Sequence, residues 1–213
     1  HYSRSDLSGK LVCKRALQRE FGFPVSDVPL LGIIGRLAFQ KGFDLLADVI
    51  PELMMMDLQL VLLGEGDRGL EEAFRAAQKQ YPKQIGLHIG FDERLAHRIE
   101  SGADMLVMPS RYEPCGLSQL YSLRYGTVPI VRRTGGLADT VVPYKPSTVQ
   151  SGHASGFQFI DPSADALLSE ILLATTLYRD RKMWGQLIQA GMATDVSWSH
   201  AAIQYVQLYE RLV

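Results

Sequence analysis

The chain reads Arg111-Tyr112-Glu113-Pro114-Cys115-Gly116-Leu117-Ser118-Gln119-Leu120 between the apolar run 105–108 and a helical pattern that continues towards residue 126. This order predicts a buried strand that ends in a turn, with the carboxylate of Glu113 in the turn and a helix after it. Gly116 lets a ligand approach the backbone closely. The backbone N–H groups of residues 116–118 then open the helix, where free N–H groups and the helix dipole attract anions.

This turn offers two kinds of contact side by side: a carboxylate for hydroxyl groups and a set of backbone N–H groups for a phosphate. The combination favours a sugar phosphate or a nucleotide sugar as the ligand. The alternative is an ordinary strand-to-helix turn whose glutamate is solvated. The segment alone does not distinguish the two, so the rest of the chain has to decide.

Short apolar runs alternate with helical patterns along the whole chain. The expected strands are residues 30–35, 58–63, 85–91, 105–108, 129–133 and 156–160, and the main expected helices are 6–23, 43–56, 92–102, 161–178, 181–193 and 199–213. This alternation is typical of the α/β class and predicts a Rossmann-like, doubly wound parallel sheet of about six strands flanked by helices. The 213 residues are enough for a single domain with a proper core.

Two segments near the end of the chain fit the pattern less simply. Residues 143–156 are rich in Pro, Ser and Gly and are expected to form a mobile loop. In the last helix, an apolar face is expected to pack either on this domain or on something outside it. Its members are Ile203, Val206, Leu208 and Tyr209.

The turn after the first expected strand carries two cations, Arg36 and Lys41, between Gly35 and Gly42. Two cations and two glycines in one loop can hold a diphosphate, because Arg offers a planar fork of donors and Lys a point charge. The alternative is that both cations are solvated on the surface.

The second strand runs into Gly64-Glu65-Gly66-Asp67-Arg68-Gly69, which matches the G-x-G-x-x-G dinucleotide fingerprint. Glu65 and Asp67 place negative charge where a pyrophosphate would bind, which argues against an NAD site. The loop is interpreted instead as a close backbone approach followed by a helix, with Asp67 as the N-cap.

Ligands of doubly wound sheets bind outside the carboxyl ends of the strands. Phe91 stands at one such end, where its ring either belongs to the core or stacks on a nucleobase. Thr134 begins another exit loop that opens a helix. The candidate ligand groups that fall on strand exits are Arg36, Lys41, Phe91, Glu113, Ser118 and Thr134, and together they favour a nucleotide-sugar site over a structural scaffold.

Composition narrows the possible partners. The formal net charge is −1, so no nucleic-acid or anionic-membrane partner is expected. Cys13 and Cys115 lack metal-ligand spacing, which fits a reduced bacterial cytoplasm or plastid stroma. No apolar run approaches the roughly 20 residues that span a bilayer. The first residues are polar and lack an initiator Met, so the chain is expected to be a piece of a longer protein.

Two blocks of sequence resemble a known family. PSRYEPCGLSQLYSLRYGTVPIVRRTGGLADT (residues 109–140) and GRLAFQKGFDLL (residues 35–46) are similar to the ADP-glucose-dependent glycogen and starch synthases. The resemblance implies a GT-B fold of two Rossmann-like domains. This chain looks like the C-terminal, nucleotide-sugar-binding half, without the N-terminal domain and its Lys-Thr-Gly-Gly-Leu motif.

The resemblance also implies roles for individual residues. Arg36 and Lys41 correspond to the pair that holds the diphosphate, and Glu113 to the carboxylate beside the donor glucose. Phe91 stands where an aromatic residue, often Tyr, stacks on adenine, and Ser118 where bacterial enzymes usually have Thr. The remaining donor-binding positions are Cys115, Gly116, Leu117, Thr134, Gly135 and Gly136. Related retaining transferases have a second Glu where this chain has Tyr121, and synthases of this type usually lack it too.

The implied reaction is a retaining transfer of glucose from ADP-glucose to the non-reducing end of an α-1,4-glucan, without a cofactor or metal. One rival is a non-catalytic module that binds nucleotide or glucan. A second is a dinucleotide-binding dehydrogenase domain built on residues 64–69. The sequence leaves open whether the product is glycogen or starch, whether UDP-glucose also serves, and which oligomer forms.

Overall fold

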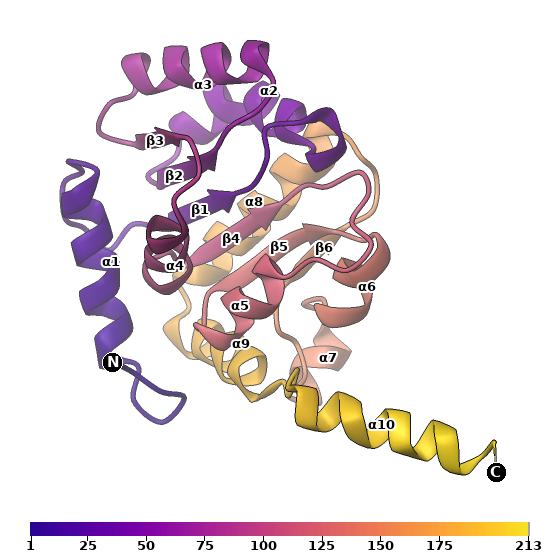
Figure 1. The fold of residues 1–213 in the computed structure, drawn as a ribbon. Helices are drawn as coiled ribbons and strands as arrows, with labels where there is room; N and C mark the ends of the chain where they lie inside the picture. Colours follow the sequence, from indigo (N-terminus) through magenta and orange to yellow (C-terminus); the bar gives the residue numbers. More distant parts are fainter. Residues whose placement is uncertain (213) are drawn as a thin grey trace.

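A six-stranded parallel sheet forms the centre of the computed structural model, which describes residues 1–212 (Figure 1). The strands are β1 (Leu30–Ile34), β2 (Gln59–Gly64), β3 (Ile85–Ile89), β4 (Met105–Met108), β5 (Val128–Arg132) and β6 (Phe157–Phe159). Their order is β3-β2-β1-β4-β5-β6, and every neighbouring pair is parallel. The chain therefore winds outward in one direction and then in the other, with β1 and β4 at the switch point. The predicted doubly wound sheet is confirmed.

Helices cover both faces of the sheet (Figure 1). The helical elements of the described residues are α1 (Ser8–Glu20), η1 (a 3₁₀ turn, Phe39–Lys41), α2 (Phe43–Met54), α3 (Arg68–Gln80), α4 (Glu93–Gly102), α5 (Ser118–Arg124), α6 (Gly135–Thr140), α7 (Pro146–Gln150), α8 (Ala164–Tyr178), α9 (Arg181–Ala193) and α10 (Trp198–Glu210). Between residues 1 and 212, no helix is long and apolar enough to cross a membrane.

Alternate residues of the central strands pack into different apolar clusters on the two faces of the sheet. Leu60 and Leu62 of β2 pack with α2, α3 and α8, while Val61 and Leu63 pack with α1 and α4. Both faces are apolar because a parallel sheet is covered on both sides. Gly32 lets α4 approach the sheet, since a Cβ atom there would lie 2.6 Å from Ile99.

The amino ends of the strands are fixed by buried polar groups. The Lys14 ammonium donates to the Asp104 carboxylate at 2.7 Å, and the same carboxylate oxygen accepts the Leu30 N–H at 2.9 Å. This contact joins α1 to the beginnings of β1 and β4.

Lys10 is buried without a direct carboxylate partner among the described residues. Its ammonium donates to the carbonyl oxygens of Ser101 and Tyr125 and to the Thr127 hydroxyl, the last at 2.7 Å. Burial lowers the pKa of Lys10 to about 8, from an ordinary 10.5, although the nearby Asp104 charge works in the opposite direction.

We expect this lysine to make the protein more stable as the pH rises from about 8 to 9.5. In this window the unfolded lysine keeps a proton that the folded one releases, so the free energy of unfolding increases by up to about 1.4 kcal/mol per pH unit. Urea unfolding of the wild type and Lys10→Met at each pH measures the difference. The exposed Lys83→Met is the control. Above about pH 10 the gain is opposed, because burial raises the pKa values of Tyr2 and Tyr178.

Residues 143–156, expected to form a mobile loop, contain the short helix α7. This helix begins with Pro146 and is held by Thr148, whose hydroxyl accepts the Lys145 N–H at 2.9 Å. The Tyr144 N–H donates to the Gly156 carbonyl at 2.7 Å. Pro and Thr, which contribute to the loop-like composition, here supply the first turn and the cap of a short helix.

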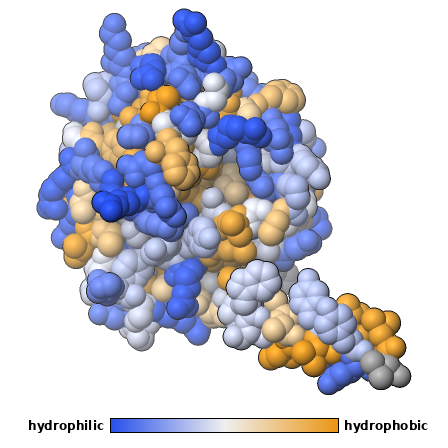
Figure 2. Space-filling model, viewed as in Figure 1, coloured by the Kyte–Doolittle hydropathy of each residue, from blue (hydrophilic) through white to orange (hydrophobic). Residues whose placement is uncertain are grey.

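Helix α10 projects away from the rest of the domain (Figures 1 and 2). None of its residues is buried, and its exposed apolar side chains include Trp198, Ile203, Val206 and Tyr209. The expected helix is therefore present, but its apolar face does not pack on this domain. Val213, included in the predicted helix, lies outside the described residues.

Ending the chain at Thr194, before α10, is expected to change the free energy of unfolding by less than about 0.5 kcal/mol, because no side chain among residues 195–212 is buried. By contrast, Trp184→Ala should cost about 3–5 kcal/mol, since Trp184 is buried against Phe157 and Tyr178. Urea unfolding of the three chains provides the comparison. A large loss on truncation would show that α10 stabilises the domain.

Candidate functional site

The exit loops of β1 and β4 meet at the switch point around a cavity of about 200 Å³. Among its lining residues are Arg36, Lys41, Glu113, Gly116, Leu117 and Ser118. A larger hollow of about 700 Å³ adjoins it and is lined by Arg36, Gly66, Phe91 and others. Arg36 belongs to both. The structure thus brings most of the predicted site residues together at the carboxyl edge of the sheet.

Glu113 is buried at the switch point and is not a solvated surface residue. One carboxylate oxygen accepts hydrogen bonds from the Lys41 ammonium at 2.5 Å and from the Ser110 hydroxyl at 3.2 Å. The interpretation of this segment as an ordinary turn with a solvated glutamate is therefore wrong. The Lys41 side chain, 27% exposed, carries the positive charge of the pair to the cavity.

Gly42 allows the loop of Lys41 to contact the loop of Glu113. Its φ is 72°, and a Cβ atom there would collide with the Pro109 carbonyl oxygen. A residue with a side chain would push the two loops apart. The contact between Lys41 and Glu113 therefore depends on a backbone-to-backbone approach at Gly42.

Gly64 and Gly66 of the G-x-G-x-x-G segment allow close contact with the backbone of the turn after β1. A Cβ atom at Gly64 would collide with the Gly35 carbonyl, and one at Gly66 with the Leu37 carbonyl. The Leu70 N–H donates to the Asp67 carboxylate at 3.0 Å, so Asp67 is the N-cap of α3. These contacts confirm the close backbone approach and the helix start.

Gln119, a residue that the sequence reasoning missed, shapes the turn after Glu113. It is fully buried, and its amide nitrogen donates to the carbonyl oxygens of Cys115 and Gly116 at 2.9 and 3.1 Å. Because both carbonyls point towards Gln119, the N–H groups of Gly116 and Leu117 point the other way. No pattern in the sequence singles Gln119 out, because four of the seven residues of α5 are polar and Ser122 is buried beside it.

The predicted residues Thr134, Gly135 and Gly136 are not among those that line the two hollows. Gly135 and Gly136 support the turn from behind, since Cβ atoms there would collide with the carbonyls of Glu113 and Cys115. The Gly136 N–H donates to the Glu113 carbonyl at 3.1 Å. Cys115 is likewise absent from the lining, and its carbonyl is taken up by Gln119.

Phe91 lies in the larger hollow and is 85% exposed, so the alternative that it belongs to the core is wrong. Its neighbour Asp92 caps α4 by accepting the Leu95 N–H at 2.8 Å. That hydrogen bond lowers the pKa of Asp92 below its ordinary value. The aromatic ring is thus held beside a helix start with its surface available.

Within residues 1–212, no three or more His, Cys, Asp or Glu side chains are grouped so that they could hold a metal ion. The charged groups at the cavity are instead the two cations, Arg36 and Lys41, and one carboxylate, Glu113. This set can bind an anionic group and a polar group side by side.

The doubly wound sheet and the site at its switch point define the chain as an α/β domain of the GT-B glycosyltransferase class. It belongs to the family Glycosyl transferases group 1, whose sequence model matches residues 14–190.

Among curated relatives, the glycogen synthase of Anaeromyxobacter dehalogenans strain 2CP-C is 51% identical over 213 residues, which is 100% of this chain and 44% of that protein. The glycogen synthase of Thioalkalivibrio sulfidiphilus strain HL-EbGR7 is 52% identical over 214 residues, with the same shares. The catalytic domain of starch synthase IV from Arabidopsis thaliana, bound to ADP and acarbose, is 34% identical with a TM-score of 0.90. That match covers 99% of this chain and 44% of the other. The chain therefore spans less than half the length of these proteins.

We expect Gly42→Ala to lower the free energy of unfolding by about 1–3 kcal/mol more than Gly152→Ala does. Both glycines have nearly the same φ, 72° and 73°, so the strain of a left-handed alanine is matched. Gly152 has nothing within 4 Å of an added Cβ atom, whereas Gly42 meets Pro109. Urea unfolding measures both variants, and equal losses would show that the loops do not need this contact.

Proposed function

We propose that this chain is the nucleotide-sugar-binding, C-terminal domain of a two-domain α-1,4-glucan synthase that uses ADP-glucose. The observation that carries the proposal is the juxtaposition of Arg36, Lys41 and the buried Glu113 at one cavity. Identity of about 50% to bacterial glycogen synthases over the whole chain supports it. So does the ADP bound by the starch synthase of similar structure.

In the proposed reaction, the bond between glucose C1 and the diphosphate oxygen breaks, and negative charge grows on the departing ADP. Arg36, Lys41 and the outward N–H groups of Gly116 and Leu117 stabilise that charge. Glu113 contacts the donor glucose, and the sugar moves with retention to the non-reducing end of the glucan. We propose that these groups suffice without a metal or cofactor.

Lys41 is paired with Glu113 at 2.5 Å, which leaves the charge of Arg36 unbalanced at the cavity. A diphosphate is an additional acceptor for the three donors of the Lys41 ammonium. Lys41 therefore links the carboxylate at the sugar side to the phosphate at the nucleotide side. We propose that this link orients the donor glucose relative to the leaving group.

Calorimetric titration of the chain with ADP, inorganic pyrophosphate and NAD tests the donor site. Arg36→Ala and Lys41→Ala should each weaken the binding of both ADP and pyrophosphate. The expected loss in binding free energy is about 1.5–3 kcal/mol, the usual range for a hydrogen bond to a charged group. Phe91→Ala should weaken ADP by about 1–3 kcal/mol through lost stacking and leave pyrophosphate unchanged. NAD should not bind.

Two outcomes would contradict this site. One is binding of NAD as tight as that of ADP. The other is the absence of ADP binding both in this chain alone and in the full-length enzyme. A loss of pyrophosphate binding in Phe91→Ala would show that the ring maintains the fold of the site rather than stacking on the base.

A non-catalytic module that binds nucleotide or glucan is the second candidate, because the chain spans only 44% of its relatives. Joining the N-terminal half of the enzyme and measuring glucan extension distinguishes the two. We propose that this half supplies the acceptor side of the cleft and binds the α-glucan. Because the relatives are bacterial glycogen synthases, we propose a bacterial cytoplasm as the site of action.

A further inference from the structure

We propose that Arg111 and Asp44 form a positioning pair that holds Lys41 against Glu113 and thereby sets the affinity for the diphosphate. The identity of the ligand in this inference rests on the proposed function. The positioning of Lys41 does not depend on that function, because it follows from contacts within this chain.

The pair itself is a two-bond fork. The Arg111 guanidinium donates to the two oxygens of the Asp44 carboxylate at 2.6 and 2.7 Å. Their side chains are only 20% and 32% exposed. Partial burial raises the pKa of Asp44, but Arg111 and backbone N–H groups outweigh it, so the net pKa is lowered. Forked Arg–carboxylate pairs combine strength with a fixed geometry.

Arg111 also holds the turn that precedes Lys41. Its guanidinium donates to the Phe39 carbonyl at 2.9 Å. It also stacks on the Phe39 ring, with Cζ of Arg111 3.7 Å from the ring centroid. Its backbone N–H donates to the Gln40 carbonyl at 2.8 Å. In return, the Gln40 amide donates to the Tyr112 carbonyl at 3.3 Å.

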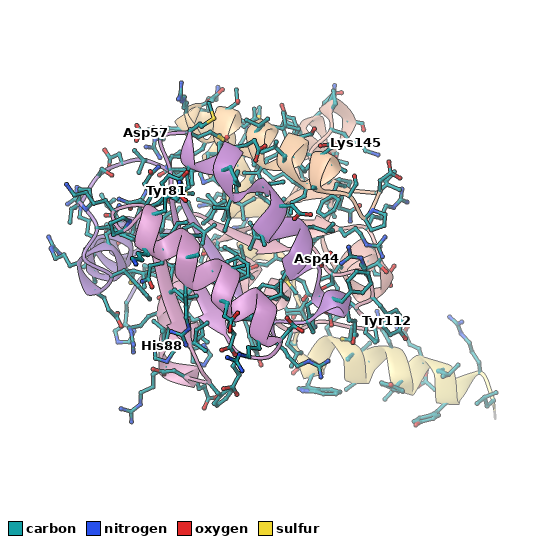
Figure 3. All side chains as sticks on the ribbon, turned by 90° about the horizontal axis from the view of Figure 1, so that it is seen from above. Asp44, Asp57, Tyr81, His88, Tyr112 and Lys145 are labelled. Carbon is teal, nitrogen blue, oxygen red and sulfur yellow. The ribbon has the colours of Figure 1, made fainter. Side chains whose placement is uncertain are left out.

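These contacts place the pair next to both charged residues of the site. Gln40 precedes Lys41, and Tyr112 precedes Glu113, so the two loops are joined one residue away from each. Figure 3 shows Asp44 and Tyr112 at the same end of the domain, with Asp57 far from them beyond the other end of α2. Lys41 has a flexible stem and gains a fixed position from this attachment.

The loop of Arg111 is in turn anchored to the sheet. Arg132, the last residue of β5, donates to the Ser110 carbonyl at 2.8 Å and to the Arg111 carbonyl. Ser110 itself donates to Glu113. Glu113 is therefore fixed to the sheet independently of Asp44, and the pair acts on the position of the Lys41 loop.

Asp44→Ala separates positioning from simple electrostatics. Removing a negative charge near the site should tighten the binding of an anion if charge alone matters. If the pair positions Lys41, Asp44→Ala and Arg111→Ala should each weaken ADP about tenfold, which corresponds to about 1.4 kcal/mol. Calorimetry with ADP measures both, and unchanged or tighter binding in Asp44→Ala would overturn the proposal.

A double-mutant cycle tests whether Arg111 acts through Lys41. In a Lys41→Ala background, Arg111→Ala should weaken ADP by less than about twofold, because the group it positions is already gone. A full tenfold loss in that background would show that Arg111 acts on the ligand or the fold independently. Arg111→Lys should not restore binding, since an ammonium cannot form the fork.

The matched control is Arg98→Ala. Arg98 forms an equivalent two-bond pair with Glu20, at 2.9 and 3.0 Å, and joins α4 to α1 away from the cavity. Its loss should leave ADP affinity unchanged. Thermal unfolding of every variant shows whether it is folded at the temperature of the titration.

A readout without nucleotide distinguishes this inference from the proposed function. The ¹⁵N signal of the Lys41 ammonium, held by Glu113, should be sharp in the wild type and in Arg98→Ala and should broaden in Asp44→Ala and Arg111→Ala. If the signals behave so but ADP binds neither to this chain nor to the full-length enzyme, the proposed function fails and the positioning of Lys41 by the pair stands. If the wild type binds ADP and neither signal nor affinity changes, the positioning pair fails alone.

Discussion

Close contact between backbone segments at the carboxyl edge of the sheet is the constraint on which the site depends. The loops after β1, β4 and β5 touch one another at Gly42, Gly135 and Gly136, where no side chain could be accommodated. Opposed charges can then meet across the loops without long, mobile side chains bridging a gap. Local glycines thus convert the general geometry of a doubly wound sheet into one particular arrangement of charges.

That arrangement is supported in layers around the Lys41–Glu113 ion pair. The Ser110 hydroxyl donates to the Glu113 carboxylate, and Arg132 donates to the Ser110 backbone carbonyl. Arg111 donates to the Phe39 carbonyl in the loop of Lys41. Leaving either charge of a partly buried ion pair without its partner is costly, because each charged group has lost part of its hydration. The surrounding hydrogen bonds keep the two partners together and give the site a defined geometry.

The sequence predicted what depends on local pattern and missed what depends on distance between loops. Apolar runs gave all six strands, and the strand exits gave Arg36, Lys41 and Glu113, because carboxyl ends of parallel strands share an edge. The Arg111–Asp44 pair and the role of Gln119 were not predicted, since neither follows a spacing rule. The short helix within residues 143–156 was not predicted, because Pro and Thr serve a short helix as readily as a loop.

The projecting helix α10 separates two properties that often change together. Resistance to unfolding comes from the sheet and its covering helices, to which α10 contributes no buried residue. Its exposed tryptophan, tyrosines and aliphatic side chains instead form an apolar surface that the rest of the domain does not cover. Substitutions on this helix can therefore change the apolar surface of the domain without changing its free energy of unfolding.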